Sequence, residues 1–227
     1  MRGAEVQLAC DFDELKPFIH DSPSPAGDII DIINGGAAWL HEGSQGFSLG
    51  INHGSHYPFC TSRECTVMQS MSDMGVPPSL VGDVIGVMRP YPIRVGSVIE
   101  DGKQVGYSGG CYDDHTEITW DEVHKRAKYP NDWNNGDGLS ELTTVTKRVR
   151  RVFEFSPKQI ELAVKVNGIN KIFLNFANYI DYGIYQKNKL SDMTDDVMAF
   201  VEKVNSISDA RVCWLGTGPN INDVVEI

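Results

Sequence analysis

The sequence predicts an α/β protein with a mostly parallel sheet and flanking helices. In the last third of the chain, helix-like and strand-like segments alternate in the order helix, strand, helix, strand. The links between them are short, which is typical of parallel strands joined by right-handed crossovers. An apolar run at residues 83–88 (DVIGVM) has the composition of a further strand earlier in the chain.

The first elements are expected to be helices that end at glycine or polar residues. Residues 11–21 (DFDELKPFIHD) predict a short helix. Residues 28–34 (DIIDIIN) repeat apolar side chains at helical spacing and stop at Gly35. Residues 37–43 (AAWLHEG) predict a buried strand that leads into a glycine-containing loop.

The middle of the chain contains more loop. A helix is predicted at residues 62–74, ending at Gly75, and Pro77-Pro78 can open another short helix. Residues 97–115 are rich in glycine and aspartate and predict loop. An amphipathic helix is expected at 117–129 (EITWDEVHKRAKY), followed by a turn at 131–138.

The alternating elements of the last third begin with a well-marked helix. Residues 156–159 (SPKQ) form a capping box with proline at the first helical position. This helix is expected to run to about Val166, with Gly168 placed to stop it. A strand follows at residues 171–176 (KIFLNF).

A second helix and strand complete this region. We expect Ser191 to cap the helix, which ends near Val204, and a strand at residues 211–216 (RVCWLG). Ligands of such sheets bind at the carboxyl ends of the strands. Residues 175–178 (NFAN) and 216–219 (GTGP) fall there, although a tight turn after a strand is an alternative explanation for the second.

Composition narrows the possible partners. Among 227 residues, 31 are acidic and 20 basic, which gives a net charge of −11 and disfavours a nucleic-acid partner. No apolar stretch approaches the length of a membrane span, and the first residues lack a secretory signal. Five cysteines fit neither a disulfide framework nor a zinc site, so we expect a cytoplasmic protein.

A cluster of cations interrupts this acidic background. Residues 143–151 (TTVTKRVRR) contain three threonines and four basic side chains. A solvated charged strand is the simpler explanation, but guanidinium groups also match carboxylates and phosphates in pairs. If the segment is extended, Arg148 and Arg150 point to one face and can share an anionic pocket, and Arg151 lies on the other side.

Other polar residues extend this candidate site. Gln45 lies between small residues and its amide can both donate to and accept from a base or ribose. Thr61 precedes a predicted helix, where a hydroxyl can contact phosphate. The phosphate-loop pattern G-x-x-x-x-G-K-[ST] and the hydrolase pattern G-x-S-x-G are both absent. The acidic residues 113–114 and His115 are better explained as a solvated loop than as a metal site.

Five segments in order resemble the adenylosuccinate synthetase family, from about Leu15 to the end of the chain. They are LKPF at 15–18, HEGSQGFSLGINHGSHYPFCTS at 41–62, MGVPPSLVGDVIGVMRPYPIRVG at 74–96, TTVTKRVRR at 143–151 and GTGP at 216–219. The resemblance implies a fold related to the phosphate-loop nucleoside triphosphatases. It also implies a ligase that joins L-aspartate to a 6-oxopurine mononucleotide, using ATP or GTP with Mg²⁺, in a homodimer.

The resemblance assigns roles to individual residues. Those implied at the purine nucleotide are Gln45, Thr61, Val95, Gly96 and Arg150. Those implied at the aspartate are Thr146 and Arg148. Those implied at the nucleoside triphosphate are Arg150, Asn175, Asn178, Gly216 and Gly218.

The chain also departs from the family pattern. The family reads guanine with T-K-L-D, where this chain has NFAN, so Asn178 replaces an aspartate and ATP or dATP becomes plausible as donor. Lys147 and Val149 replace a glycine and a proline. The motifs TTVTKRVRR and GYSG…EITW resemble the phage branch that makes 2-aminoadenylosuccinate from dGMP, although IMP remains the alternative substrate.

The family's phosphate loop, catalytic residues and Mg²⁺ ligands precede the matched region. We therefore expect the catalytic residues and metal ligands upstream of Met1, and none of them within the chain itself. Residues 1–227 are expected to form a single domain, the C-terminal portion of a synthetase, with a sheet incomplete at the N-terminus and a loop-rich insertion at about 97–138. The alternative is a catalytically inactive nucleotide-binding remnant. A phage-encoded protein of this kind would work in the host cytoplasm.

Overall fold

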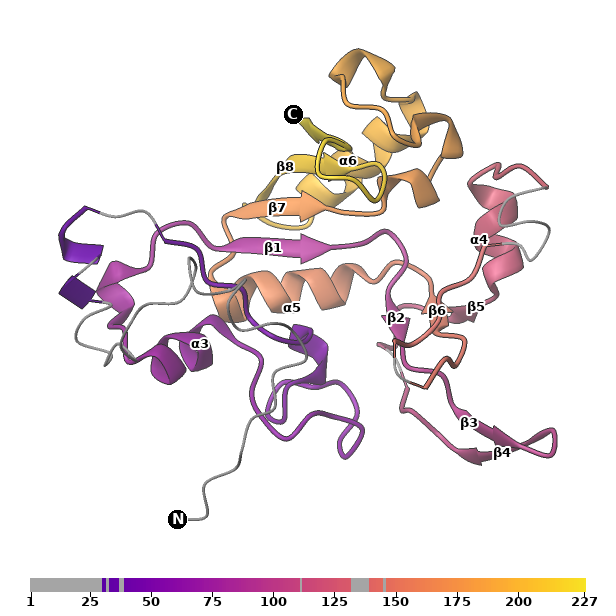
Figure 1. Ribbon diagram of the computed structural model, residues 1–227, viewed down its shortest axis with the longest axis horizontal. Helices are drawn as coiled ribbons and strands as arrows, with labels where there is room; N and C mark the ends of the chain where they lie inside the picture. The colour runs from indigo at the N-terminus through magenta and orange to yellow at the C-terminus, as the bar shows by residue number, and fades with distance from the viewer. Residues whose placement is uncertain (1–29, 32, 37–38, 111, 132–138, 145) are drawn as a thin grey trace, which may run out of the picture.

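The fold is taken from a computed structural model (Figure 1). It describes residues 30–31, 33–36, 39–110, 112–131, 139–144 and 146–227. Met1, the helix expected at 11–21 and nearly all of the turn expected at 131–138 lie outside the described residues. Among the described residues, no helix is long and apolar enough to cross a membrane.

The main sheet confirms the α/β prediction. It has the strand order β1-β7-β8-β9, with β1 (Ile85–Met88), β7 (Lys171–Leu174), β8 (Arg211–Gly216) and β9 (Val224–Glu226). The first three strands are parallel and β9 is antiparallel to β8. The predicted strands correspond to β1, β7 and β8, whereas β9 was not predicted.

Two helices pack against one face of this sheet. Helix α5 (Pro157–Asn167) connects into β7, and α6 (Asp195–Asn205) connects β7 to β8. As predicted, the Ser156 hydroxyl accepts a hydrogen bond from the Gln159 amide at 3.0 Å, and Gly168 ends α5 in the left-handed conformation. The core between helices and sheet includes Ile160, Ile172, Leu174, Val197, Val201, Val204, Val212 and Leu215.

Helix α6 begins later than expected. Thr194 occupies the N-cap position, and Ser191 lies in a separate 3-10 helix, Leu190–Asp192. The prediction that Ser191 caps this helix is therefore wrong. The fully buried residues of α6 begin at Val197, whereas Met193, before the helix, is only partly buried against the core.

The N-terminal predictions are met in part. Helix α3 (Val67–Met74) is capped by Thr66 and stopped by Gly75, but it starts five residues later than expected. Residues 30–31 and 33–34 are helical, whereas the described part of the strand expected at 37–43 is not a strand. Its side chains from Leu40 onward are exposed, so no buried neighbour holds them in a sheet.

A second, antiparallel sheet lies beyond the carboxyl end of β1 (Figure 1). Its order is β2-β6-β5, formed by β2 (Ile93–Arg94), β6 (Arg151–Phe153) and β5 (Glu117–Ile118). Helix α4 (Trp120–Arg126) follows β5 and is capped by Thr119. The expected helix at 117–129 thus begins three residues late, because its first residues pair with β6.

A hairpin projects from this second sheet (Figure 1). It consists of β3 (Val98–Glu100) and β4 (Lys103–Gly106), joined by Asp101 and Gly102. Both turn residues have positive φ, 49° and 73°, as a tight hairpin turn requires. The interpretation of residues 97–115 as loop is wrong for these two strands.

The segment 175–184 joins the two parts of the molecule. Ala177 and Ile184 are buried in the core of the main sheet. Tyr179 is buried in a second core, with Trp120, Val123 and Val152. One short segment is therefore anchored on both sides.

Candidate functional site

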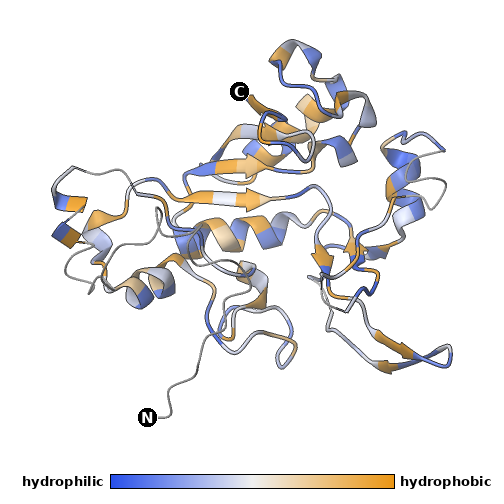
Figure 2. Ribbon diagram, in the orientation of Figure 1, coloured by the Kyte–Doolittle hydropathy of each residue, from blue (hydrophilic) through white to orange (hydrophobic). Residues whose placement is uncertain are grey.

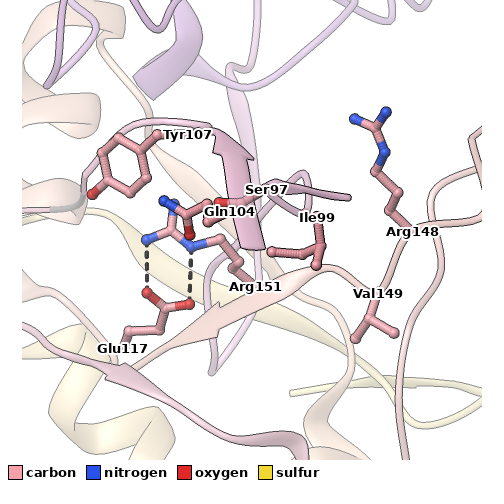
Figure 3. A pocket seen from close by; sticks show the side chains of 9 residues that line it. Ser97, Ile99, Gln104, Tyr107, Glu117, Arg148, Val149 and Arg151 are labelled. Atoms are coloured by element: carbon pink, nitrogen blue, oxygen red, sulfur yellow. Dashed lines mark hydrogen bonds and ion pairs between the residues drawn. The ribbon is translucent and has the colours of Figure 1, made fainter. Parts of the chain in front are cut away.

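A pocket of about 470 Å³ opens between the second sheet and the hairpin (Figure 3). It brings together residues far apart in the sequence, including two of those predicted for substrate binding, Gly96 and Arg148. The lining residues are Gly96, Ser97, Ile99, Gln104, Tyr107, Glu117, Arg148, Val149 and Arg151.

Arg151 holds one wall of the pocket. Its Nε and Nη2 donate to the two carboxylate oxygens of Glu117 at 2.9 and 2.6 Å, as Figure 3 shows. Its Nη1 donates to the Ser108 hydroxyl at 3.0 Å and to the Gly109 carbonyl at 2.5 Å. The hydrogen bonds that Arg151 donates to Glu117 raise the pKa of Arg151 despite its partial burial. With these partners, Arg151 has a structural role in this wall of the pocket.

Arg148 is differently placed. It is exposed and extends away from Arg151 in Figure 3. Within the described part of the chain, its guanidinium makes no hydrogen bond or ion pair. A guanidinium presents five donors, so Arg148 is available to a carboxylate or phosphate.

A tight turn places Thr146 next to Arg148. The Thr143 amide donates to the Arg148 carbonyl at 2.8 Å, and the Arg148 amide donates to the Thr143 hydroxyl at 2.9 Å. The hydroxyls of Thr143 and Thr146 lie 2.6 Å apart. The two residues predicted to bind aspartate therefore belong to one closed turn.

The expected arrangement of the arginines is wrong. Arg148 and Arg151 line the pocket, whereas Arg150 does not. That arrangement assumed a segment extended from Lys147 to Arg151, and Lys147 has a φ of 52°, so the segment is not extended throughout. Arg150 instead turns back toward the preceding residues, where its Nε donates to the Leu142 carbonyl at 3.3 Å.

Gly96 packs directly against this turn. A Cβ atom at Gly96 would lie 2.3 Å from the Val149 carbonyl oxygen and 3.2 Å from the Arg148 Cβ. Its neighbour Val95 is half exposed. One residue predicted at the ribose, Gly96, therefore lies against one predicted at the aspartate, Arg148.

Thr61 and Gln45 lie on two loops that contact each other. The Thr61 amide donates to the Leu49 carbonyl at 2.8 Å. Thr61 does not precede a helix directly, since α3 begins at Val67, so the expected helix-terminus contact is not formed. Gln45 is exposed with a φ of 69° and its Oε1 lies 3.9 Å from the Cys65 sulfur.

Glu64 fixes the loop that carries Thr61. Its side chain is 8% exposed and accepts from the Asn52 and Cys65 amides at 2.8 and 2.9 Å. Burial alone would raise the pKa of this carboxyl, but the two amides and nearby His53 bring the pKa below 4.5. An ionised carboxylate therefore stabilises the loop.

Arg94 connects this loop to the pocket. Its Nη2 donates to the Phe59 carbonyl at 2.9 Å and to the Ser108 carbonyl at 2.7 Å. Gly109 approaches the Phe59 ring closely, and a Cβ there would lie 2.5 Å from the Phe59 Cβ. The Thr61 loop and the pocket are thus parts of one connected region.

The predicted triphosphate residues form a separate group at the carboxyl ends of β7 and β8. The Asn175 Oδ1 accepts from the Phe176 amide at 2.9 Å and leaves no space for a Cβ at Gly216, which would lie 2.2 Å away. Asn178 is 5% exposed, and its Nδ2 donates to the Tyr129 hydroxyl at 2.5 Å. Gly218 lies against Asp223.

Several residues of this region were not predicted. Arg89 lies just after β1, stacks over the Phe176 ring at 4.0 Å and pairs with Glu141, which also accepts from the Tyr179 hydroxyl at 2.9 Å. The position of Arg89 at the carboxyl end of a parallel strand was a usable signal. Gln104 and Tyr107 carried no signal, because their hairpin had not been predicted.

No group of three or more metal-ligating side chains occurs among the residues that the structure describes. The acidic residues 113–114 instead bind groups at the N-terminus of helix α5. Asp113 pairs with Lys158 at 2.8 Å, and the Asp114 carboxylate accepts from the Ser156 hydroxyl at 2.6 Å and the Lys158 amide at 2.9 Å. Carboxylates at a helix N-terminus satisfy its free amides.

The catalytic residues expected upstream of Met1 stay a prediction. They would lie outside these 227 residues, and Met1 itself is not among the described residues. The described residues form a region around Gly96, Arg148 and the Thr143–Arg148 turn. It offers an available guanidinium, hydroxyls and close backbone approach at one place, which suit carboxylate and nucleotide ligands.

Comparison with known protein families finds a match to adenylosuccinate synthetase over residues 7–182. An N6-succino-2-amino-2'-deoxyadenylate synthase of Acinetobacter phage SH-Ab 15497 is 43% identical over 179 residues, which is 78% of this chain and 39% of the relative. The adenylosuccinate synthetase of Methanococcus aeolicus is 30% identical over 98% of this chain and 57% of the relative. The chain thus spans about half the length of these relatives.

Two solved structures are also similar. The succinoaminodeoxyadenylate synthetase of cyanophage S-2L, bound to dGMP and to dATP as an energy donor, has a TM-score of 0.61 and 33% identity. The match covers 81% of this chain and 45% of that one. The adenylosuccinate synthetase of Plasmodium falciparum has a TM-score of 0.69 at 17% identity over 95% of this chain and 55% of that one, and supports the fold.

Proposed function

Since the chain belongs to the adenylosuccinate synthetase family, we propose that it is part of a ligase for purine nucleotide synthesis. The ligase condenses L-aspartate with a 6-oxopurine mononucleotide, driven by a nucleoside triphosphate, to give an adenylosuccinate-type product. The observation that carries this proposal is the meeting of Gly96 with the Thr143–Arg148 turn, which supports adjacent ribose and carboxylate sites.

Arg148 is the proposed anchor for aspartate. Its guanidinium is available to the two oxygens of a carboxylate, and Thr146 can add a hydroxyl from the same turn. Burying the carboxylates here fixes the amine of aspartate relative to the purine, which lowers the entropic cost of the condensation. Arg150, which lies behind the turn, is proposed to approach both nucleotides when the turn closes over substrate.

Thr61 and Gln45 are proposed to hold the mononucleotide, with Val95 and Gly96 at its ribose. The loop of Thr61 is fixed by Glu64 and joined to the pocket by Arg94, so phosphate and ribose contacts would keep a constant separation. We propose dGMP as the substrate, because the cyanophage S-2L relative binds dGMP. IMP is the alternative.

The donor is proposed to lie at Asn175, Asn178, Gly216 and Gly218. Asparagine offers both a donor and an acceptor, so it suits adenine as well as guanine. We propose ATP or dATP, since dATP is the energy donor of the cyanophage S-2L relative, with GTP as the alternative. Asn178 already donates to Tyr129, which leaves its carbonyl oxygen for the amino group of adenine.

Mg²⁺ is expected to accompany the triphosphate. The described residues offer no cluster that fits it, so its ligands would be supplied by the part of the synthetase that lies outside the segment matched here. The same holds for the catalytic groups. We further propose a homodimer in the cytoplasm, or in the host cytoplasm for a phage protein.

The test is aspartate-dependent release of nucleoside diphosphate. The chain is assayed alone and together with the part of the Acinetobacter phage relative outside the matched segment. Each sample is supplied with dGMP or IMP and with ATP, dATP or GTP. We expect turnover with dGMP in the combined sample, and a clear preference for IMP would exclude the dGMP assignment.

Arg148→Ala separates the aspartate role from folding. It should raise the KM for aspartate at least tenfold, whereas Lys125→Ala, an exposed cation on α4, should leave it unchanged. Nucleotide binding without any turnover in the combined sample would instead support the inactive remnant. No nucleotide binding at all would refute both versions.

A further inference from the structure

We propose that Arg89 and Glu141 are positioning residues that couple the donor site at the end of β7 to the turn that carries Arg148. Binding of a nucleoside triphosphate at Asn175 and Asn178 then orders the turn for aspartate. Neither positioning residue is among those predicted for substrate binding, and the coupling rests on the function proposed above.

Arg89 is packed against the donor side of this connection. It is the first residue after β1, a strand that is mostly apolar (Figure 2). Its Cζ lies 4.0 Å from the centroid of the Phe176 ring and 5.8 Å from the centroid of the Tyr179 ring. Both rings belong to the short segment that contains the two asparagines proposed for the donor. A ligand that moves this segment therefore also moves the surface on which Arg89 packs.

Glu141 contacts both sides of the connection. Its carboxylate accepts hydrogen bonds from both terminal nitrogens of Arg89, with Nη1 at 3.3 Å, and from the Tyr179 hydroxyl at 2.9 Å. Burial and the neighbouring Glu141 raise the pKa of Tyr179, so this hydroxyl stays protonated and donates at neutral pH. The carbonyl of Glu141 accepts from the Arg150 amide at 2.7 Å. The side chain of Glu141 is thus bound to the donor side and its backbone to the strand that leaves the turn.

The turn itself begins at the next residue. Leu142 and Val149 form an antiparallel bridge that closes the Thr143–Arg148 turn. Glu141 and Arg150 form the adjacent rung, through the hydrogen bond from the Arg150 amide. A displacement of Glu141 therefore moves the turn through two successive rungs.

The composition of this network favours a positioning role over a purely stabilising one. The side chains of Arg89 and Glu141 are 18% and 20% exposed, and a mostly buried ion pair is weak evidence for stability, because apolar residues of similar volume often do as well. Among the described residues, the Arg89 Nε is buried without a hydrogen-bond partner. Such a donor is unfavourable, so a movement that brings it an acceptor would be favoured.

Hydrogen exchange of the 227-residue chain tests the coupling without requiring turnover. Saturating ATP should slow exchange of the Arg148 and Arg150 amides by about fivefold or more, although both amides lie outside the donor site. Calorimetry measures the Kd of ATP in parallel. L-aspartate should lower that Kd by about fivefold or more, since coupling between two binding sites is reciprocal.

The variants remove the connection while keeping the donor site. Arg89→Lys keeps the charge but loses the two-point contact with Glu141, so ATP should bind and most of the slowing should disappear. A second variant combines Arg89→Met with Glu141→Gln, which leaves no unpaired charge buried, and it should behave in the same way. Arg126→Lys is the matched control, because Arg126 pairs with Glu122 and Glu154 outside the network and should keep the full effect.

Thermal unfolding checks that each variant folds. A merely structural role for Arg89 would change exchange equally with and without ATP, and that result would overturn the coupling. ATP binding that leaves the turn unprotected, or full protection in Arg89→Lys, would also overturn it and leave the proposed function standing. If the chain binds none of ATP, dATP and GTP, the proposed donor site and the coupling fail together.

Discussion

The contact between Gly96 and the Val149 carbonyl allows a quantitative prediction. Gly96→Ala would place a methyl carbon 2.3 Å from that oxygen, whereas ordinary contacts of this type are about 3.3–3.6 Å. The turn must therefore move by about 1 Å, a strain for which overpacking typically costs about 1–3 kcal/mol. In a chain of this size each kcal/mol lowers Tm by about 2–4 °C, so we expect a fall of about 2–12 °C.

Differential scanning calorimetry measures this directly, with Gly82→Ala as the control. A Cβ at Gly82 meets nothing within 4 Å, so this variant should melt at the wild-type temperature or slightly above it. In the combined sample, Gly96→Ala should also raise the KM for aspartate, because Arg148 moves with the turn. A Gly96→Ala protein that melts within about 1 °C of wild type, with an unchanged KM, would refute the close packing on which the site is built.

Two further predictions concern stability. Ser156→Ala removes the cap of α5 and a partner of Asp114, and should cost about 1 kcal/mol, measured as a shift of the urea midpoint; an unchanged midpoint would contradict it. Glu64→Gln should cost about 1–2 kcal/mol near pH 7. Folding lowers the pKa of Glu64, so this stability difference should be fully present above pH 4.5 and should disappear as the pH falls through the folded-state pKa. A stability difference that grew in acid would contradict the assignment.

Local signals predicted the elements of the last third well. Ser156, Pro157 and Gly168 define α5 without help from the rest of the chain, and the apolar runs of β7 and β8 have no competing interpretation. The hairpin β3–β4 was missed although Asp101-Gly102 is a strong turn signal, because glycine and aspartate elsewhere in the segment suggested loop. Thr194 and Ser191 are equally good caps by sequence, and only packing of α6 decides between them.

The site was predictable as a set of residues more than as a geometry. Gly96 and Arg148 do meet, but Arg150 does not line the pocket, and Lys147 has a positive φ that interrupts the extended segment. A single positive φ at a lysine cannot be read from sequence. Arg94 and Arg151 act through carbonyl groups of distant loops, so their bracing roles depend on tertiary structure that no local pattern encodes.

The anchoring of segment 175–184 in two cores restricts how the protein can evolve. An inserted or deleted residue between Ala177 and Tyr179 would pull one of them out of its core, since each is fixed on a different side. Changes at this segment, where the donor nucleotide is proposed to bind, must therefore arise by substitution on a backbone of constant length. Lineages should differ here in residue identity and agree in spacing, unlike the hairpin β3–β4, whose exposed tip can accept changes in length.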